Sequence, residues 1–335
     1  MKIRKRGLEM KRLSIYVLML ALLTIILAAC SSDEEKTQDT DTKGEAVTIQ
    51  GSNGEVTLDQ AAKKVVVLEW TYAENLLALG IQPAGMADIE SYGDYVNIDP
   101  QLDDTVVDVG GRQEPNLEAI AALEPDLIIG VDFRHTAMLK DLESIAPTVI
   151  FNPYPTDENI DLYEEMEITF NEMAKAVGKE AEAKEVLADL EDTYKEKAAE
   201  IEAANLKTKD TILTLAYSGA AAPEIRVFTP NSMASIILGK LGLNNVHQPD
   251  QFEVFGSSTY NVEGLTKYEN ANYMFTVPDE DNIYKNQLKG NAVWENLAFV
   301  KEDRTYDLGA ATWLYGGPLS AKTLVNQITD VLVNK

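Results

Sequence analysis

Arginine is scarce in this 335-residue chain, so the places where it occurs are informative. Beyond the first 29 residues the sequence holds nineteen lysines but only four arginines. Arg112, Arg134 and Arg226 stand where apolar, strand-like runs meet loops, whereas Arg304 has the position of a structural residue at a strand entry. A guanidinium grips anionic oxygens with two parallel hydrogen bonds, which lysine cannot copy. Each arginine alone could pair with a surface acid, but together they predict a site for an anionic ligand.

Aromatic side chains recur near the ends of the same apolar runs. Most tryptophans and tyrosines belong to a protein core, yet their indole and phenol groups can also hydrogen-bond a polar ligand while the ring covers its apolar parts. We therefore expect the ligand to contact three arginines and five aromatic residues: Arg112, Arg134, Arg226, Trp70, Tyr92, Tyr217, Trp313 and Tyr315.

Catalytic and metal-binding patterns are missing from the sequence. It holds two histidines, His135 and His247, and neither a Gly-x-Ser-x-Gly elbow nor a glycine-rich phosphate loop. A transition-metal site built on imidazoles needs more histidines than this. We expect a binding protein with no catalytic residue, no cofactor and no metal bound by protein groups, and an exported hydrolase is the alternative from another class.

The N-terminus has the pattern of a secretory signal. Lysine and arginine crowd the first twelve residues, and an apolar run follows over 13–27. A permanent membrane span is the alternative, but the run is shorter than the roughly 20 residues that cross a bilayer core. It ends in Leu-Ala-Ala-Cys, which resembles the lipobox of bacterial lipoproteins, so we expect a signal peptide over 1–29 and diacylation of Cys30, which would anchor the chain outside the cell membrane.

Charge and composition narrow the partners further. The net charge of −26 argues against nucleic acid and acidic phospholipid, because neither gains from contact with such a surface. Residues 30–46 are polar, acidic and free of aromatics, which predicts a disordered tether. Cys30 is the only cysteine, so the folded part is expected to stand without a disulfide.

From residue 47 onward, strand and helix patterns alternate. Short β-branched runs predict strands, and they lie at 64–70, 106–111, 126–130, 148–151, 211–217, 225–229, 273–277 and 304–309. The stretch 159–207 lacks a strand pattern and predicts two helices. This order indicates an α/β fold with parallel-rich sheets and a ligand edge at the carboxyl ends of the strands. We expect an N-terminal lobe over 47–158, an interlobe helix over 159–178 and a C-terminal lobe over 179–335.

The two predicted lobes echo each other. The segment from Asn116 and the segment from Asn261 share an asparagine, an apolar residue, a glutamate, a helical turn and a strand, and the helices near Ala73 and Ala234 are also alike. Chance similarity of α/β units is the alternative to duplication. Glu118 and Glu263 hold the same place in the first pair of segments, either as first-turn acids that favour a helix dipole or as docking points for a two-sided partner.

Several segments together resemble the ferric-siderophore-binding lipoproteins of ABC importers, the family of ferrichrome-binding and iron(III)-citrate-binding proteins. They cover 70–88, 109–130, 145–151, 228–243 and 312–321. The resemblance implies two Rossmann-like lobes joined by a single long helix, a shallow cleft between them and little closure on binding. It also implies that the arginine of Gly-x-Arg-x-Glu-Pro-Asn, here Arg112, contacts the iron-bound oxygens of the siderophore, and that Glu118 and Glu263 meet arginines of a permease.

The same resemblance implies a monomeric, membrane-tethered receptor whose partners are a ferric siderophore, an ABC permease and its ATPase. Arg134 and Arg226 match arginines of citrate-type and hydroxamate-type relatives. Three arginines suit a ligand with carboxylates, such as a citrate-based hydroxamate, better than a neutral ferric trihydroxamate. A haem or cobalamin receptor of the same architecture is the alternative within binding proteins, and haem would ask for an axial histidine, methionine or tyrosine.

Overall fold

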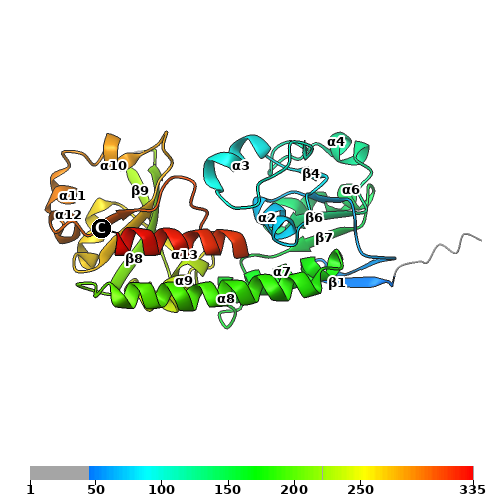
Figure 1. Cartoon of the computed structure of the whole chain (residues 1–335). Helices are drawn as coiled ribbons and strands as arrows, with labels where there is room; N and C mark the ends of the chain where they lie inside the picture. The colour runs from blue at the N-terminus through cyan, green and yellow to red at the C-terminus, as the bar shows by residue number, and fades with distance from the viewer. Residues whose placement is uncertain (1–44, 221, 335) are drawn as a thin grey trace, which may run out of the picture. The chain divides into compact units, whose positions relative to one another are not determined.

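The computed structural model describes residues 45–220 and 222–334. The predicted signal peptide, Cys30 and nearly all of the predicted tether lie outside the described residues. The described chain forms two α/β lobes connected by helices, as the sequence predicts (Figure 1). Within the described residues no helix is both long enough and apolar enough to cross a membrane.

The N-terminal lobe is built on a parallel sheet of five strands with the order β5-β4-β3-β6-β7. The strands are β3 (Val65–Val67), β4 (Gly85–Met86), β5 (Val107–Asp108), β6 (Leu127–Val131) and β7 (Thr148–Phe151). A separate hairpin, β1 (Val47–Gly51) with β2 (Gly54–Leu58), precedes it. The chain order reverses between β3 and β6, and such a switch point opens a crevice at the carboxyl ends of the two strands.

Helices cover both faces of this sheet, which gives two apolar clusters on its two sides. They are α2 (Trp70–Ala78), α3 (Ile89–Tyr95), α4 (Leu117–Ala122), α5 (Asp132–His135) and α6 (Leu139–Glu143), with a 3-10 turn over Thr136–Met138. The helical segment between β6 and β7 is divided into short pieces. Thr136 bonds back to the Asp132 carbonyl at 2.7 Å, and the 3-10 turn separates α5 from α6.

The C-terminal lobe has a mixed sheet with the order β11-β9-β8-β12-β13, and β10 also pairs with β8. Its strands are β8 (Asp210–Ser218), β9 (Pro223–Phe228), β10 (Asn244–Asn245), β11 (Ser257–Tyr260), β12 (Asn272–Thr276) and β13 (Thr305–Asp307). β10, β12 and β13 run parallel to their partners, whereas β9 is antiparallel to both of its neighbours, β8 and β11. The helical segments of this lobe are α9 (Met233–Lys240), α10 (Ile283–Asn286), α11 (Ala292–Asn296), α12 (Ala298–Lys301), α13 (Pro318–Val333) and the 3-10 helix η3 (Val262–Tyr268).

The echoing segments fold alike. Asn116 caps α4, which leads into β6, and Asn261 caps η3, which leads into β12. The helices α2 and α9 both end in a glycine with positive φ, 74° at Gly80 and 75° at Gly242, followed by a backbone bond of 2.9 Å to a carbonyl five residues earlier. Such a C-terminal cap favours glycine because other residues strain there.

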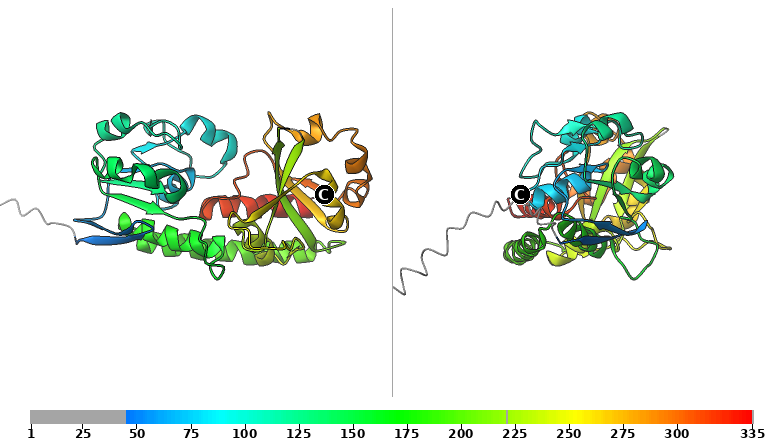
Figure 2. Two further views of the ribbon diagram at one scale, coloured as in Figure 1. Left: turned by 180° about the vertical axis from the view of Figure 1, so that it is seen from behind. Right: turned by 90° about the vertical axis from the view of Figure 1, so that its right-hand side faces the viewer.

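The connection between the lobes consists of two long helices, α7 (Leu162–Ala176) and α8 (Glu180–Ala203). The start of α7, with Met166, packs in the C-lobe core, and its end, with Phe170 and Met173, packs in the N-lobe core. α8 runs back in the other direction, from Ala183 in the N-lobe core to residues in the C-lobe core, and passes beneath both lobes (Figures 1 and 2). The helix expected over 159–178 corresponds to α7, and α8 shares its connecting role.

A buried carboxylate also ties the lobes together. Glu74, on α2 of the N-terminal lobe, is fully buried and accepts hydrogen bonds from the first turn of α13. Its Oε1 accepts from the backbone N–H of Gly317 at 2.8 Å and of Ser320 at 2.7 Å, and its Oε2 accepts from the Ser320 hydroxyl at 2.7 Å. No side chain of α13's own segment caps this helix. Glu74 therefore satisfies the free N–H groups and the positive dipole end of a helix in the other lobe.

Candidate ligand-binding site

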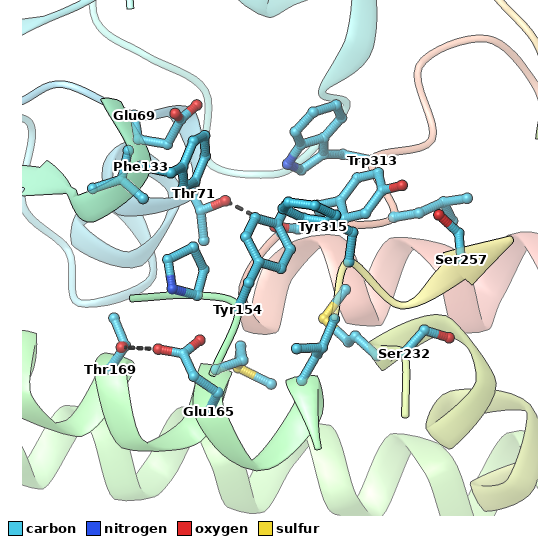
Figure 3. A pocket seen from close by; sticks show the side chains of 18 of the residues that line it. Glu69, Thr71, Phe133, Tyr154, Glu165, Thr169, Ser232, Ser257, Trp313 and Tyr315 are labelled. Atoms are coloured by element: carbon cyan, nitrogen blue, oxygen red, sulfur yellow. Dashed lines mark hydrogen bonds between the residues drawn. The ribbon is translucent and has the colours of Figure 1, made fainter. Parts of the chain in front are cut away.

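A cavity of about 510 Å³ lies where the two lobes and α7 meet (Figure 3). Its N-lobe wall comes from the carboxyl ends of β3 and β6, which is where the sheet topology predicts a crevice. Its C-lobe wall comes from β9, α9 and the loop before α13. Charged, polar and aromatic side chains line much of this cavity: Glu69, Tyr72, Asn75, Arg112, Phe133, Arg134, Tyr154, Glu165, Thr169, Arg226, Phe255, Trp313 and Tyr315.

Arg112 is positioned by the turn that follows β5. Gly110 has φ of 93°, and a Cβ there would meet the Asn116 backbone nitrogen at 3.0 Å, so this glycine is required, whereas the space beside Gly111 is open. Asn116 then caps α4 by accepting hydrogen bonds from the N–H groups of Glu118 and Ala119. This tight turn carries the Arg112 side chain back toward β3, which explains the glycine and asparagine around it.

The Arg112 guanidinium is held on three sides. Its Cζ lies 3.5 Å from the centre of the Trp70 ring, which is a close cation–π contact. Its Nη1 donates to Glu69 at 2.8 Å, and its Nε donates to Asp88 at 3.1 Å. Trp70 is in turn fixed by donating its own Nε1–H to the Asp88 carbonyl at 3.0 Å. Arg112 is therefore ordered before any ligand arrives.

Glu69 joins two of the arginines. It follows β3 and is 8% exposed, and its two carboxylate oxygens accept separately from Nη1 of Arg112 and Nη1 of Arg134. Arg134 itself follows β6, the neighbouring strand across the switch point. The sequence analysis did not include Glu69, because it counted this residue as part of a strand over 64–70. The signal was available, since a carboxylate at the carboxyl end of a strand stands at the ligand edge.

His135 supports the same group from behind. Its Nδ1 accepts a hydrogen bond from the Val131 N–H at 2.9 Å, so the ring proton must lie on Nε2, which donates to the Arg112 carbonyl at 2.8 Å. The ring is fully buried, and burial lowers the pKa of His135. The imidazole is therefore neutral at pH 7 and holds the backbone of Arg112.

Arg226 reaches the cavity from the C-terminal lobe. It lies on β9 opposite Leu215 of β8, and its Cζ is 5.0 Å from the Tyr217 ring centre. Tyr217 donates its hydroxyl hydrogen to Glu224 at 2.9 Å. Within residues 45–220 and 222–334, no carboxylate forms an ion pair with Arg226. Arg226 is thus the arginine of the cavity that keeps its charge free for a ligand.

Aromatic rings form the remaining wall and the rim. Trp313 and Tyr315, in the loop before α13, lie 5.6 Å apart, and Trp313 also packs on Trp70 at 5.3 Å. Tyr154 stands between Phe133 at 5.6 Å and Phe255 at 5.0 Å, so one ring from each lobe flanks it. Phe133 is 50% exposed and Phe255 is 58% exposed. Exposed phenylalanines at the mouth of a cavity indicate a surface that covers the apolar parts of a ligand. The sequence analysis missed these two residues.

Five of the eight predicted contacts line the cavity: Arg112, Arg134, Arg226, Trp313 and Tyr315. The other three, Trp70, Tyr92 and Tyr217, do not line it. Trp70 and Tyr92 are 2% and 3% exposed, their ring centres lie 6.0 Å apart, and Trp70 packs against Arg112. Tyr217 lies within β8 rather than after it, because the strand continues to Ser218, and it contacts Arg226 from the side. All three support cavity residues instead of facing the cavity.

The other singled-out residues lie away from the cavity. Glu118 on α4 and Glu263 on η3 are both exposed, next to the asparagines that cap these helices. Arg304 is 6% exposed and donates to the carbonyls of Ala271 and Glu269, which agrees with the structural role expected for it. In the part of the chain that the structure describes, no three histidine, cysteine, aspartate or glutamate side chains group as a metal site would require.

Known proteins share this sequence and architecture. Residues 65–312 match the periplasmic binding protein family. The Fe(3+)-citrate-binding protein YfmC of Bacillus subtilis is 30% identical over 326 residues, which cover 94% of this chain and 96% of that protein. A putative ABC transporter substrate-binding lipoprotein of the same organism, YhfQ, is 28% identical over 312 residues, which cover 90% and 91%.

A solved structure agrees with both relatives. The Fe3+-Desferal-bound siderophore-binding protein FhuD from Vibrio cholerae has a TM-score of 0.72 at 28% identity and covers 81% of this chain and 98% of its own. These relatives are binding proteins rather than enzymes, and they confirm the resemblance seen in the sequence motifs. The match spans both lobes and every arginine of the cavity, so this chain belongs to the periplasmic binding protein family.

Proposed function

We propose that this protein is an extracytoplasmic receptor that captures an iron(III)-siderophore and delivers it to an ABC importer. The observation that carries the proposal is the convergence of Arg112, Arg134 and Arg226 on one cavity between the lobes. The chain as a whole has a net charge of −26, so these three arginines place positive charge locally in a protein that is otherwise strongly negative. They provide hydrogen-bond donors for the oxygens of an iron chelate.

The charge of the cavity suggests how the chelate sits. Glu69 already neutralises part of the Arg112 and Arg134 pair, so these two groups act as ordered donors toward the iron-coordinating oxygens. Arg226 forms no ion pair with a carboxylate among the described residues, so it suits a free carboxylate of the ligand. We therefore propose a ligand of the citrate-hydroxamate type, or another carboxylate-bearing siderophore, with one carboxylate toward the C-terminal lobe.

Iron itself is cargo in this proposal. The siderophore supplies all of the oxygens that coordinate the metal, and the protein binds the outside of the complex without catalysing a reaction. The exposed rings of Phe133 and Phe255 cover the apolar arms of the chelate. No resident cofactor takes part in this mode of binding.

Delivery needs a partner and a location. We propose that Glu118 and Glu263, both exposed at helix starts, contact basic residues of the permease, whose ATPase drives import. Two acyl chains on Cys30 would hold the monomeric receptor on the outer face of the cell membrane, with 30–46 as the tether.

Haem would need an axial ligand other than histidine, because tyrosine and methionine are the residue types that line the cavity and could ligate its iron. His135 uses both ring nitrogens in hydrogen bonds, and His247 uses both in bonds to Ser258 and Tyr268, so neither is available as an axial ligand. Cobalamin carries a single anionic phosphodiester, so it would satisfy fewer of the three arginines than a chelate with several anionic oxygens. Both chromophores are therefore useful comparison ligands in a binding test.

Tryptophan fluorescence provides the direct test, because Trp313 lines the cavity and Trp70 packs against it. Purified protein is titrated with a ferric citrate-hydroxamate, with the same ligand free of iron, with ferrichrome, and with haem and cobalamin. We expect saturable quenching at low concentration with the first ligand only. An equal response to ferrichrome would show that the ligand needs no carboxylate. Tight binding of haem alone would identify a haem receptor and contradict the proposed function.

A further inference from the structure

Glu165 gives the cavity an acidic group that the arginines do not neutralise. It lies on α7, and its carboxyl group rises into the cavity with Thr169 beside it, while Glu69 projects from the far side (Figure 3). Its Oε1 accepts a hydrogen bond from the Thr169 hydroxyl at 2.5 Å. Within residues 45–220 and 222–334, no lysine or arginine forms an ion pair with it. Its neighbours on the wall include Leu162, Met166 and Pro153, which offer no hydrogen-bond donor from their side chains.

The lack of a cationic partner sets the half-buried Glu165 apart from the buried carboxylates Glu69 and Glu74. Glu69 accepts from two guanidinium groups, and Glu74 accepts from the first turn of α13. Burial, with a smaller contribution from the nearby Asp132 carboxylate, raises the pKa of Glu165 to about 7, although the hydrogen bond from the Thr169 hydroxyl lowers it. A carboxyl group that lacks a cation in an apolar wall is costly unless something binds it.

Unpartnered polar atoms lie on the same wall. The Tyr72 hydroxyl is buried without a hydrogen-bond partner, and Tyr72 itself is 2% exposed and lines the cavity. Glu165 lines the same cavity, and after burial its negative charge has the largest effect in raising the pKa of Tyr72. The Asn75 Oδ1, on the next turn of α2, is also buried without a partner. Buried polar atoms without partners are rare and call for a ligand or water.

Glu165, Tyr72 and Thr169 supply oxygen acceptors, and an ammonium group has three hydrogens to donate. We propose that these three residues form a subsite for a protonated primary amine carried by the bound chelate. The inference rests on the proposed function, since the chelate's iron-bound oxygens are taken by the arginines. It adds that the ligand is dipolar, with anionic oxygens toward Arg112, Arg134 and Arg226 and a cationic arm toward α7.

The test compares two ferric chelates that differ in a single group. One is a linear ferric trihydroxamate with a free terminal amine, and the other is the same chelate with that amine acetylated, and the same pair is made on a citrate-based hydroxamate. Wild-type protein should bind the free amine at least about tenfold more tightly, as a charge-assisted hydrogen bond in a buried site requires. Glu165→Gln should bring the two affinities together, and Thr169→Val should reduce the preference in part.

Glu164→Gln is the matched control, because Glu164 is the preceding residue of the same helix, is exposed and does not line the cavity. It should keep the full preference for the amine. Thermal unfolding of Glu165→Gln should occur no lower than in wild type, which shows that the variant is folded.

The outcomes separate the two proposals. Equal binding of amine and acetylated chelates by wild-type protein, or an unchanged preference in Glu165→Gln, would overturn the subsite and leave the receptor function standing. Failure of wild-type protein to bind any ferric chelate of either pair would overturn the receptor function and the subsite with it.

Discussion

The imidazole of His135 and the backbone carbonyl of Arg112 are joined by a hydrogen bond of 2.8 Å, although 23 residues separate them in the chain. The bond runs from the end of one strand–helix unit to the turn of another, and it fixes the place from which the Arg112 side chain starts. Because Nδ1 already accepts from Val131, the bond depends on a neutral ring.

Acid should therefore weaken both the fold and the site. The pKa of His135 is lowered by burial, so the unfolded chain takes up protons near pH 6.5 before the native protein does. Stability should fall as the pH drops below about 6.5, and ligand affinity should fall when the ring is finally protonated and loses the Val131 bond. Thermal unfolding and titration at pH 7.5, 6.5 and 5.5 measure the two effects.

His135→Phe tests the same bond at constant pH. The ring shape is kept, but the Val131 N–H and the Arg112 carbonyl lose their partner, which should cost about 1–3 kcal/mol of stability and lower ligand affinity. His247→Phe is the control, because His247 is equally buried and bonds Ser258 and Tyr268, away from the cavity. Loss of affinity in both variants alike would show that His135 acts only through stability.

Glu69→Gln should separate fold stability from ligand choice. The two guanidinium groups would lose a shared carboxylate, so the free energy of unfolding should fall by about 1–3 kcal/mol. The freed positive charge should raise the affinity for chelates with additional carboxylates and steepen the salt dependence of binding. Calorimetric titration at two salt concentrations measures this, with the exposed Glu90→Gln as control. An affinity that falls for every anionic chelate would mean that Glu69 contacts the ligand itself.

The hydrogen bonds between Glu74 and the start of α13 predict that two substitutions of Glu74 will differ in their effect on stability. Glu74→Gln keeps an oxygen for the Gly317 and Ser320 N–H groups and can donate to the Ser320 hydroxyl, so its stability should stay close to that of wild type. Glu74→Ala leaves those groups unpaired in a buried place and should cost about 2–4 kcal/mol. Chemical denaturation measures both. Equal loss in both variants would show that the charge itself, through the α13 dipole, holds the lobes.

Burial raises the pKa of Glu74, so the native protein binds its proton more readily than the unfolded chain does. Its contribution to stability should decline as the pH rises above the ordinary glutamate range, and Glu74→Gln should remove that part of the pH dependence.

The aromatic rim should matter for binding alone. Phe133 and Phe255 are half-exposed, so replacing either with alanine should change stability by less than about 0.5 kcal/mol, yet it should weaken binding of a chelate with apolar arms several-fold. Ile168→Ala is the control, since Ile168 is 49% exposed on the outside of α7. Unchanged affinity in Phe133→Ala and Phe255→Ala would place the ligand deeper than the rim.

Arg112 and Arg134 could be found from the sequence because parallel strands end at one edge of a sheet, so residues that follow β5 and β6 meet in space. The rule does not account for Arg226, which lies inside the antiparallel strand β9. The lobes were predictable from alternation of strand and helix patterns. Tyr217 was expected to contact the ligand because it stands at the end of a strand pattern, but β8 continues its antiparallel pairing with β9 through Ser218, and the Tyr217 ring packs against the Arg226 guanidinium.

Glu165 was missed for a different reason. It stands in an acidic stretch in which charged residues usually face water, and only the packing of α7 under both lobes turns this one inward. Phe133 and Phe255 were missed because they stand in a four-residue helix and in a turn, where a single apolar residue carries no periodic signal. Sequence patterns indicate where strands end, but they do not show which face of a helix between two lobes will line a cavity.

The hydrogen bonds from α13 to Glu74 bear on how a loaded receptor of the proposed kind would be recognised. Because this buried carboxylate links α2 of one lobe to α13 of the other, we expect little hinge closure when a ligand binds. A permease would then distinguish the two states at the mouth of the cavity, where a bound chelate covers Phe133 and Phe255.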